Sequence, residues 1–190
     1  MRAFVAIEIP APDVGAGGRA APEHLTLRFL GNTPSEQIPS IVDRLREVAR
    51  AHAPFDLTIE GIGAFPSRAS PRIVWLGVGA GGGPLGELAN DVRRALTEEG
   101  TRRPEGPFVP HVTWFRVRSP AERRTALDLL EGRLVGPPPR SVRVNAFVLK
   151  ESVLGPGGAV HRTLAELLLD APSRSVPTSA ARSSTNFRQR

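Results

Sequence analysis

The chain has 190 residues, 40% of them hydrophobic, which is enough for a buried core in one domain or two small lobes. It contains no cysteine, so disulfides, thiol catalysis and cysteine-based metal sites are excluded. No apolar run reaches the roughly 18 residues of a membrane-spanning helix, and the opening MRAFVAIEIP lacks the pattern of a secretory signal. We therefore expect a cytoplasmic protein with no membrane partner.

The net charge of +6 is unevenly distributed along the chain. Residues 171–190 contain four arginines and no acid, so they supply four of the six charges. Their Ser/Pro/Arg-rich composition predicts a disordered tail after a folded region of residues 1–170. Lys150 is the only lysine among the 25 basic residues. The arginine content has two open interpretations, a genome-wide compositional bias and electrostatic attraction to a polyanion.

The first half of the chain is predicted to contain four strands and two helices. Strands are indicated over residues 2–9, 24–30, 55–62 and 72–78. Thr33 is the candidate N-cap of the first helix, with Pro34 at the first helical position and Glu36 closing a capping box. Apolar residues then follow at helical spacing, and a second helix is predicted over residues 85–98. The GAGGG stretch before it lacks the Lys-Ser/Thr ending of a phosphate-binding loop and predicts a flexible turn.

The pattern then repeats. Residues 111–117 form a strand that again begins His-x-Thr, and Ser119-Pro120-Ala121-Glu122 repeats the capping signal before a third helix. Strands over residues 142–149 and 160–169 complete the chain. HLTLRFLGNTPSE and HVTWFRVRSPAE are thus two versions of one unit. This repeat predicts an α+β fold with two pseudo-symmetric lobes, each a mainly antiparallel sheet with helices on its outer face, around a central cleft.

The two His-x-Thr strands carry the candidate chemistry. In regular strands, alternation places three side chains of each strand together on the cleft side: His24, Thr26 and Arg28, and His111, Thr113 and Phe115. Arg116 would then point to the opposite face, where solvation or packing competes with substrate contact. Because histidine has a pKa of about 6.5, one imidazole can accept a proton while its partner donates one. With threonine hydroxyls as oxyanion donors, such a pair suits cleavage of a phosphodiester.

Other interpretations of these residues are weaker. Each His-x-Thr could be structural, although two copies in matching places of a repeat argue against this. Zinc binding is disfavoured because the other histidines are only His52 and His161, and His52 is at the polar end of a predicted helix. Trp75 and Trp114 suit the core better than base stacking. Phe65-Pro66 is either a simple turn or an approach to the cleft.

Several segments together resemble a known family. HLTLRFLG, PHVTWFRV, MRAFVAIEIP, GIGAFPSRASPRIVWLGV and VLKESVLGPGGAVHRTLAEL are similar to segments of the two-histidine phosphoesterases. Their closest branch is the RNA 2′,3′-cyclic phosphodiesterases, historically called 2′–5′ RNA ligases. The resemblance covers about residues 1–170. It departs from the family in the short stretch 10–23, in Trp114-Phe115, and in His161, where the family often has an aromatic residue.

The resemblance implies hydrolysis of an RNA-terminal 2′,3′-cyclic phosphate to a 2′-phosphomonoester, without metal or other cofactor. By analogy His24 is the proton donor to the 3′ oxygen, His111 is the proton acceptor from water, and Thr26 and Thr113 hold the phosphate. Arg28, Phe115 and Arg116 are further candidate substrate contacts. The expected partner is RNA with a cyclic phosphate end, tRNA fragments included, bound by a monomer, with minor reversible 2′–5′ ligation. Two alternatives stay open: a small nucleotide substrate such as the cyclic phosphate of ADP-ribose, and a non-catalytic module that binds RNA ends.

Overall fold

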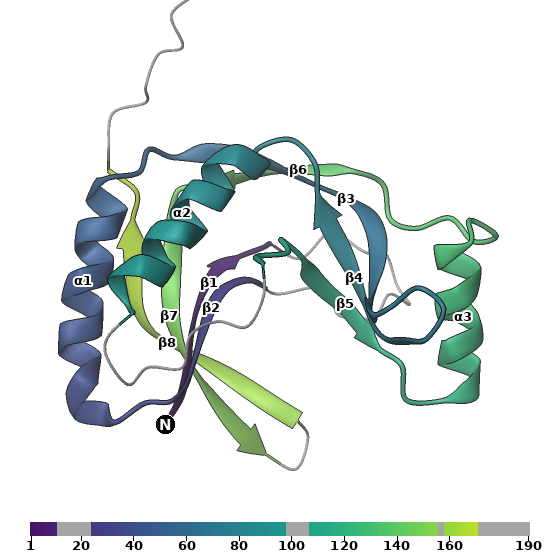
Figure 1. Ribbon diagram of the computed structural model, residues 1–190, viewed down its shortest axis with the longest axis horizontal. Coiled ribbons are helices and arrows are strands. Elements are labelled where there is room, and N and C mark those ends of the chain that lie inside the picture. The colour runs from purple at the N-terminus through teal and green to yellow at the C-terminus, as the bar shows by residue number, and fades with distance from the viewer. Residues whose placement is uncertain (11–23, 98–106, 156–157, 171–190) are drawn as a thin grey trace, which may run out of the picture.

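The computed structural model describes residues 1–10, 24–97, 107–155 and 158–170 (Figure 1). They form an antiparallel sheet of eight strands in the order β6-β3-β4-β5-β2-β1-β7-β8, together with three α-helices. The predicted α+β class is confirmed. The predictions for residues 11–23 and for the tail 171–190 lie outside the described residues. No helix in the described part of the chain is long and apolar enough to cross a membrane.

The elements follow the predicted order. The strands are β1 (Arg2–Glu8), β2 (His24–Asn32), β3 (Phe55–Pro66), β4 (Pro71–Val78), β5 (Val112–Arg116), β6 (Arg140–Val144), β7 (Ala146–Gly155) and β8 (Gly158–Leu168). The helices are α1 (Ile38–Arg50), α2 (Gly82–Ala95) and α3 (Pro120–Leu130). The predicted strand over residues 142–149 is in fact two strands, because β6 pairs with β3 whereas β7 pairs with β1.

Two halves of the sheet meet at a single residue pair. Strands β6, β3, β4 and β5 form one half, and β2, β1, β7 and β8 form the other. β2 and β5 are antiparallel and pair at Leu25 and Val112. Two halves are present, as the repeat predicts, but each combines strands of both repeats, since β2 lies with β7 and β8 whereas β5 lies with β3 and β4. Their strands form one continuous sheet through this pair. Both His-x-Thr motifs therefore lie at the centre of the molecule.

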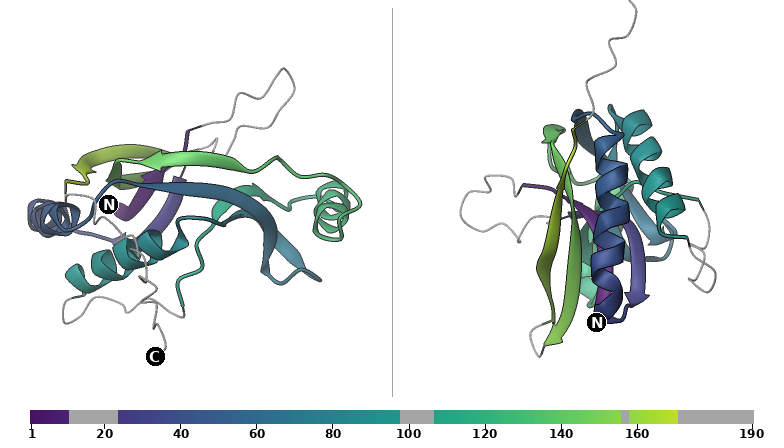
Figure 2. Two further views of the ribbon diagram at one scale, coloured as in Figure 1. Left: turned by 90° about the horizontal axis from the view of Figure 1, so that it is seen from above. Right: turned by 90° about the vertical axis from the view of Figure 1, so that its left-hand side faces the viewer.

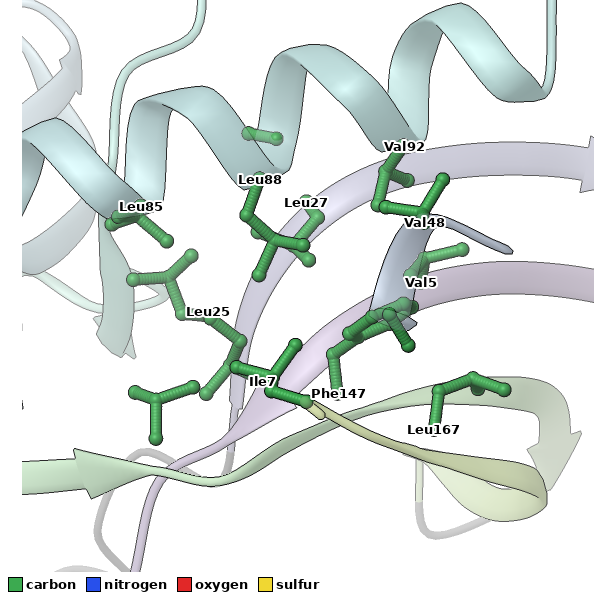
Figure 3. Packing of buried hydrophobic residues seen from close by; sticks show 14 of the residues in the cluster. Val5, Ile7, Leu25, Leu27, Val48, Leu85, Leu88, Val92, Phe147 and Leu167 are labelled. Carbon is green, nitrogen blue, oxygen red and sulfur yellow. The ribbon is translucent and has the colours of Figure 1, made fainter. Parts of the chain in front are cut away.

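All three helices pack on the same face of the sheet, called here the helix face. The main core lies between α1, α2 and alternate residues of the central strands, including Val5, Ile7, Leu25, Leu85 and Phe147 (Figure 3). A second cluster of Val74, Phe115, Ala126 and Leu129 lies beneath α3. Figure 2 shows α2 along one side of β1, β2 and β7. The predicted placement of the helices on one outer face is thus confirmed.

The first predicted capping box is wrong. A 3₁₀ turn begins at Ser35 and α1 begins at Ile38, and no side chain caps either start. Thr33 is buried, and its backbone N–H donates to the Met1 carbonyl (2.7 Å) while the Met1 ammonium donates to the Thr33 carbonyl (2.9 Å). These bonds continue the β1–β2 hydrogen bonding one residue beyond both strands, so Thr33 is held beside Met1 and does not start the helix.

The second predicted capping box is present. Ser119 Oγ accepts a hydrogen bond from the Glu122 backbone N–H (3.2 Å), and Glu122 Oε2 accepts one from the Arg118 backbone N–H (2.6 Å). Pro120 takes the first helical position. The GAGGG stretch is a turn, as predicted, but α2 begins within it. Gly81 caps the helix with φ 81°, and a Cβ there would lie 2.0 Å from the Asp56 carbonyl oxygen.

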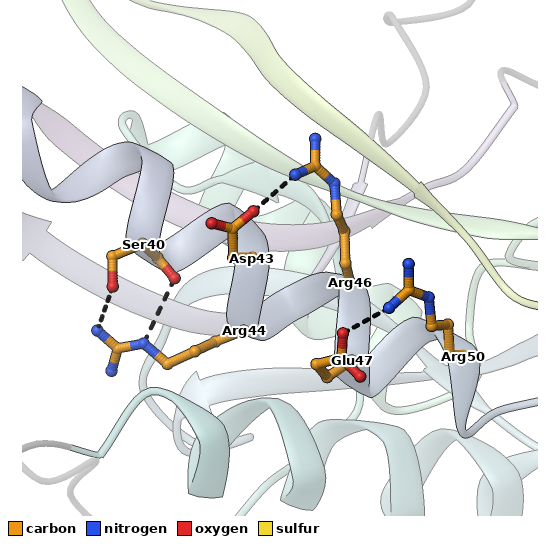
Figure 4. A network of polar contacts seen from close by, with 6 residues as sticks. All are labelled: Ser40, Asp43, Arg44, Arg46, Glu47 and Arg50. Carbon is orange, nitrogen blue, oxygen red and sulfur yellow. Dashed lines mark hydrogen bonds and ion pairs between the residues drawn. The ribbon is translucent and has the colours of Figure 1, made fainter.

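Ion pairs cover the exposed face of α1 (Figure 4). Arg46 pairs with Asp43 at 2.7 Å and Arg50 pairs with Glu47 at 2.5 Å, each three residues apart on the helix. These side chains are well exposed, so each pair contributes little to stability. Here the arginines form an ordinary solvated helix surface.

Candidate active site

The two His-x-Thr motifs lie side by side on the face of the sheet opposite the helices. Because Leu25 pairs with Val112, continuing the antiparallel register by one residue places His24 across from Thr113 and Thr26 across from His111. Leu25 and Val112 point into the core on the helix face, so their four neighbours point to the other face. We call it the histidine face. Diagonal neighbours across antiparallel strands lie about 7–8 Å apart, with their Cβ atoms somewhat closer, so the two imidazoles can contact one phosphate group.

An extra residue in β2 changes the predicted position of Arg28. Ala6 pairs with Thr26 but Val5 pairs with Arg28, so Leu27 is a β-bulge. Arg28 is therefore on the helix face, where it is buried and donates hydrogen bonds to the Arg93 carbonyl and to Thr97 Oγ1. Our placement of Arg28 beside His24 is wrong, because it assumed a regular strand.

A matching bulge occurs in β5. Trp75 pairs with Thr113 and Val74 pairs with Phe115, so Trp114 is the extra residue. Phe115 turns to the helix face and packs beneath α3. Arg116 pairs with Ile73, two residues before Trp75 in β4, and is exposed on the histidine face. The predicted faces of Phe115 and Arg116 are thus reversed, and Phe115 does not crowd the two histidines.

His111 is held by a hydrogen bond and two aromatic rings. Its Nδ1 lies 2.8 Å from the Val109 carbonyl oxygen, so Nδ1–H donates and Nε2 can accept a proton. Phe65 meets the imidazole edge-on, with ring centroids 4.9 Å apart at 83°, and the Trp75 ring is 6.0 Å away. A Cβ on Gly63 would lie 2.1 Å from the Trp75 ring, so only glycine lets this ring lie across β3. Phe65 and Trp75 line the site, whereas Trp114 packs against the core.

His24 is surrounded by the outer strands of its own half. Its ring centroid is 5.1 Å from those of Phe4 and His161, and the His161 ring meets it at 86°. Glu8 lies opposite His24 in the β1–β2 register, and its carboxylate accepts a hydrogen bond from Lys150 Nζ (2.5 Å). Lys150 is only 8% exposed.

Burial makes the protonated form of His24 unfavourable. Loss of hydration, followed by the positive charges of His161 and Lys150, lowers the pKa of His24 from 6.5 to about 4, although Glu8 opposes the shift. His24 Nδ1 is buried without a hydrogen-bond partner among the described residues. His24 is therefore neutral at pH 7 before a ligand binds. A phosphate anion beside it would raise its pKa again, because an opposite charge favours the protonated form.

Sequence reasoning missed four residues that contact or face the site. Phe4 and Glu8 carry no motif, and Phe29 reaches this face only because the bulge moves it opposite Phe4. Lys150 had a detectable signal, since it is the only lysine and interrupts an apolar strand. His161 was recognised only as a departure from the family.

The remaining histidine lies away from the site. His52 Nε2 is 2.9 Å from Asp91 Oδ2, and this pair links the end of α1 to α2. Within the described ranges, no group of three or more histidine and carboxylate side chains is placed to hold a metal ion.

Comparisons with known proteins agree with this geometry. A family model described as the 2′-5′ RNA ligase superfamily matches residues 15–155. The chain is 35% identical to an RNA 2′,3′-cyclic phosphodiesterase of Aeropyrum pernix over 76% of this chain and 80% of that protein. It is 36% identical to one of Methanothermobacter thermautotrophicus over 73% of each chain.

Solved structures give the same result. A crystal structure of a Thermus thermophilus protein has 29% identity and a TM-score of 0.67, covering 90% of this chain and 99% of the other. E. coli LigT complexed with 3′-AMP has 26% identity and a TM-score of 0.62, covering 88% and 97%. The paired His-x-Thr motifs at the centre of one antiparallel sheet, together with these matches, show that the chain belongs to the 2′-5′ RNA ligase superfamily.

Proposed function

We propose that the protein is an RNA 2′,3′-cyclic phosphodiesterase that forms a 2′-phosphomonoester without a metal ion. The observation that carries this proposal is the pairing of Leu25 with Val112, which brings the two His-x-Thr motifs together on the histidine face. The curated relatives bear the name of this activity, and the LigT structure holds a nucleotide. We place the enzyme in the cytoplasm, as a monomer that acts on RNA ends, tRNA fragments included.

In the proposed reaction a water oxygen attacks phosphorus and the bond from phosphorus to the 3′ oxygen breaks. His111 Nε2 accepts the proton of the water, and His24 donates its proton to the departing 3′ oxygen. The hydroxyls of Thr26 and Thr113 donate hydrogen bonds to the non-bridging phosphate oxygens, where negative charge builds up. The phosphate remains on the 2′ oxygen. A 5′-hydroxyl in place of water gives a 2′–5′ linkage by the same steps, as a minor activity.

Because the pKa of His24 is low, this residue can act as a proton donor only once the substrate is bound. In the free protein His24 is neutral near pH 7, so the proton it donates is taken up together with the anionic substrate. In addition to protonated His24, the Arg116 guanidinium is a positive group on the histidine face, beyond Thr113 along β5. We propose that its guanidinium binds the phosphate or the adjacent RNA backbone.

An RNA oligonucleotide with a 2′,3′-cyclic phosphate end tests the function directly. Wild type, His24→Ala and His111→Ala are assayed in excess EDTA, and the product is identified as the 2′- or the 3′-phosphate. We expect 2′-phosphate from wild type and a rate at least about 100-fold lower for each variant. Full activity of both variants would defeat the mechanism, and loss of wild-type activity in EDTA would indicate a metal.

The same assay separates the alternatives. ADP-ribose cyclic phosphate is supplied in parallel at equal concentration. A kcat/KM for this nucleotide above that for RNA would favour the small-nucleotide substrate. Tight RNA binding without turnover would favour the module that only binds RNA ends.

A further inference from the structure

Each of the two site histidines is contacted edge-on by a ring from an outer strand. Phe65 of β3 meets His111 at 4.9 Å and 83°, and His161 of β8 meets His24 at 5.1 Å and 86°. The two contacts have nearly the same geometry but different chemistry. Phe65 is never charged, whereas His161 can carry a proton. The two halves of the site therefore differ, because the ring beside His24 is ionisable and the ring beside His111 is not.

The strand register fixes His161 on the histidine face. In the β7–β8 ladder Thr163 pairs with Lys150 and His161 pairs with Ser152. Lys150 also pairs with Phe4, which contacts the rings of both His24 and His161. Arg162 is the next residue along β8, pairs with Glu151 and thus points to the opposite face. His161 consequently approaches His24 from the side away from β5.

Four ionisable groups act on His24 from the surrounding strands. They are Glu8 of β1, Lys150 of β7, His161 of β8 and His111, which immediately precedes β5. Glu8 and Lys150 are bonded to each other, so their opposite charges largely offset at His24. His111 lies across the β2–β5 join. His161 is the ionisable group whose ring is in direct contact with His24.

We propose that His161 is a positioning residue for His24. The His161 ring holds the His24 ring edge-on, and the two imidazoles together carry at most one positive charge until an anionic phosphate binds. Two imidazoles at this separation repel each other when both are protonated, so they titrate as a coupled pair. The lowered pKa of His24, to which His161 contributes the largest charge effect, agrees with this arrangement. The consequence for catalysis rests on the proposed function, but the coupling of the two rings does not.

Histidine NMR titration of the full-length protein tests the coupling without substrate. His161→Phe keeps an aromatic ring beside His24, as Phe65 is beside His111, and removes the ionisable group that competes with His24 for a proton. His161→Gln removes the charge with a smaller side chain, in case the Phe variant does not fold. Arg162→Met is the matched control, because it removes a neighbouring positive charge from the opposite face. The imidazole signals of His24 are followed from about pH 3 to about pH 8 in each protein, a window that contains both the wild-type midpoint near 4 and the ordinary histidine value of about 6.5.

We expect both His161 variants to raise the titration midpoint of His24 by about one pKa unit, and Arg162→Met to leave it within about 0.2. An unchanged midpoint in the folded His161 variants, or an equal shift in Arg162→Met, would overturn the inference. Where wild type hydrolyses cyclic phosphate, the acidic limb of the pH profile of kcat/KM should move up by the same amount in His161→Phe. A wild type that lacks this activity but shows the NMR shift would refute the proposed function and leave the coupling standing.

Discussion

At the scale of single residues, Leu27 and Trp114 decide which side chains share a face with the two histidines. Each is the extra residue of a β-bulge directly after the threonine of a His-x-Thr motif. Each bulge turns the next residue, Arg28 or Phe115, toward the helices. The residue after that, Phe29 or Arg116, then reaches the histidine face. The two arginines thus lie on opposite faces of the sheet, and substitutions can test whether their roles differ.

Arg116→Met should weaken substrate binding without affecting the fold. Loss of one charge-assisted hydrogen bond, worth about 1.5–3 kcal/mol, predicts a KM for cyclic-phosphate RNA at least about tenfold higher. The free energy of unfolding in urea should stay within about 0.5 kcal/mol of wild type. An unchanged KM would remove Arg116 from the proposed substrate contacts.

Arg28→Met is the counterpart to that experiment. Because Arg28 is buried and bonded to the end of α2, its loss leaves the Arg93 carbonyl without this donor and should cost about 1–3 kcal/mol of stability. KM should stay close to wild type in protein that is still folded. A large rise in KM at full stability would place Arg28 at the substrate after all.

The low pKa of His24 predicts a loss of stability in mild acid. The unfolded chain binds this proton below pH 6.5, whereas the folded chain binds it only near pH 4. The stabilisation is therefore complete above pH 6.5 and falls as the pH drops toward 4. The full shift corresponds to about 3 kcal/mol, which partial exposure of the ring reduces to about 2. Between pH 7 and pH 5, wild type should lose about 1 kcal/mol more than His24→Gln in urea unfolding, and an equal or smaller loss would contradict this sign.

At the scale of elements, the starts of α1 and α3 have similar sequences but contribute differently to the stability of the fold. Ser119 caps α3 through the Glu122 backbone N–H, but the start of α1 has no side-chain cap. Ser119→Ala should cost about 1 kcal/mol. Ser35→Ala, at the exposed start of the 3₁₀ turn, should cost less than about 0.5 kcal/mol in the same thermal or urea unfolding. Equal costs would show that the capping bond is not what stabilises α3.

The sequence pattern predicted the type and order of most elements, because apolar periodicity reports local structure. It could not predict the events decided by pairing between distant segments. Thr33 is bonded to Met1, just beyond the ends of β2 and β1, and so does not cap the helix. The apolar run around Asn145 splits because its two parts pair with different strands.

The candidate site likewise has residues that the sequence predicts and residues that it does not. The histidines and threonines carry a repeated motif, so the sequence alone pointed to them. The faces of Arg28, Phe115 and Arg116 depend on bulges that period-two alternation does not contain. The Lys150–Glu8 contact joins residues 142 positions apart, and no local pattern reports such a contact.

At the scale of the whole molecule, the site lies at the seam between two halves. One backbone pair, Leu25 with Val112, joins them, and each half contributes one histidine, one threonine and the rings around its own histidine. We propose that the folded unit is residues 1–170 and that residues 171–190 are an appended tail.

Deletion of residues 171–190 tests this division. The deleted segment carries four arginines and no acid, so the slope of log binding constant against log salt for single-stranded RNA should fall by up to about 3. The cooperative unfolding transition and the turnover of a short cyclic-phosphate substrate should remain. Loss of the transition in the shortened chain would show that the tail is part of the folded unit.

The most direct test of a shared phosphate between the two imidazoles is a double-mutant cycle on the cleavage rate. The kcat for cyclic-phosphate RNA is measured for His24→Ala, His111→Ala and the double variant, with folding checked by circular dichroism. Two groups that act as one unit are strongly non-additive, so the double variant should be no more than about threefold slower than the slower single variant. A double variant slowed by the full product of the two single effects would mean that the histidines act independently, and would contradict the central claim.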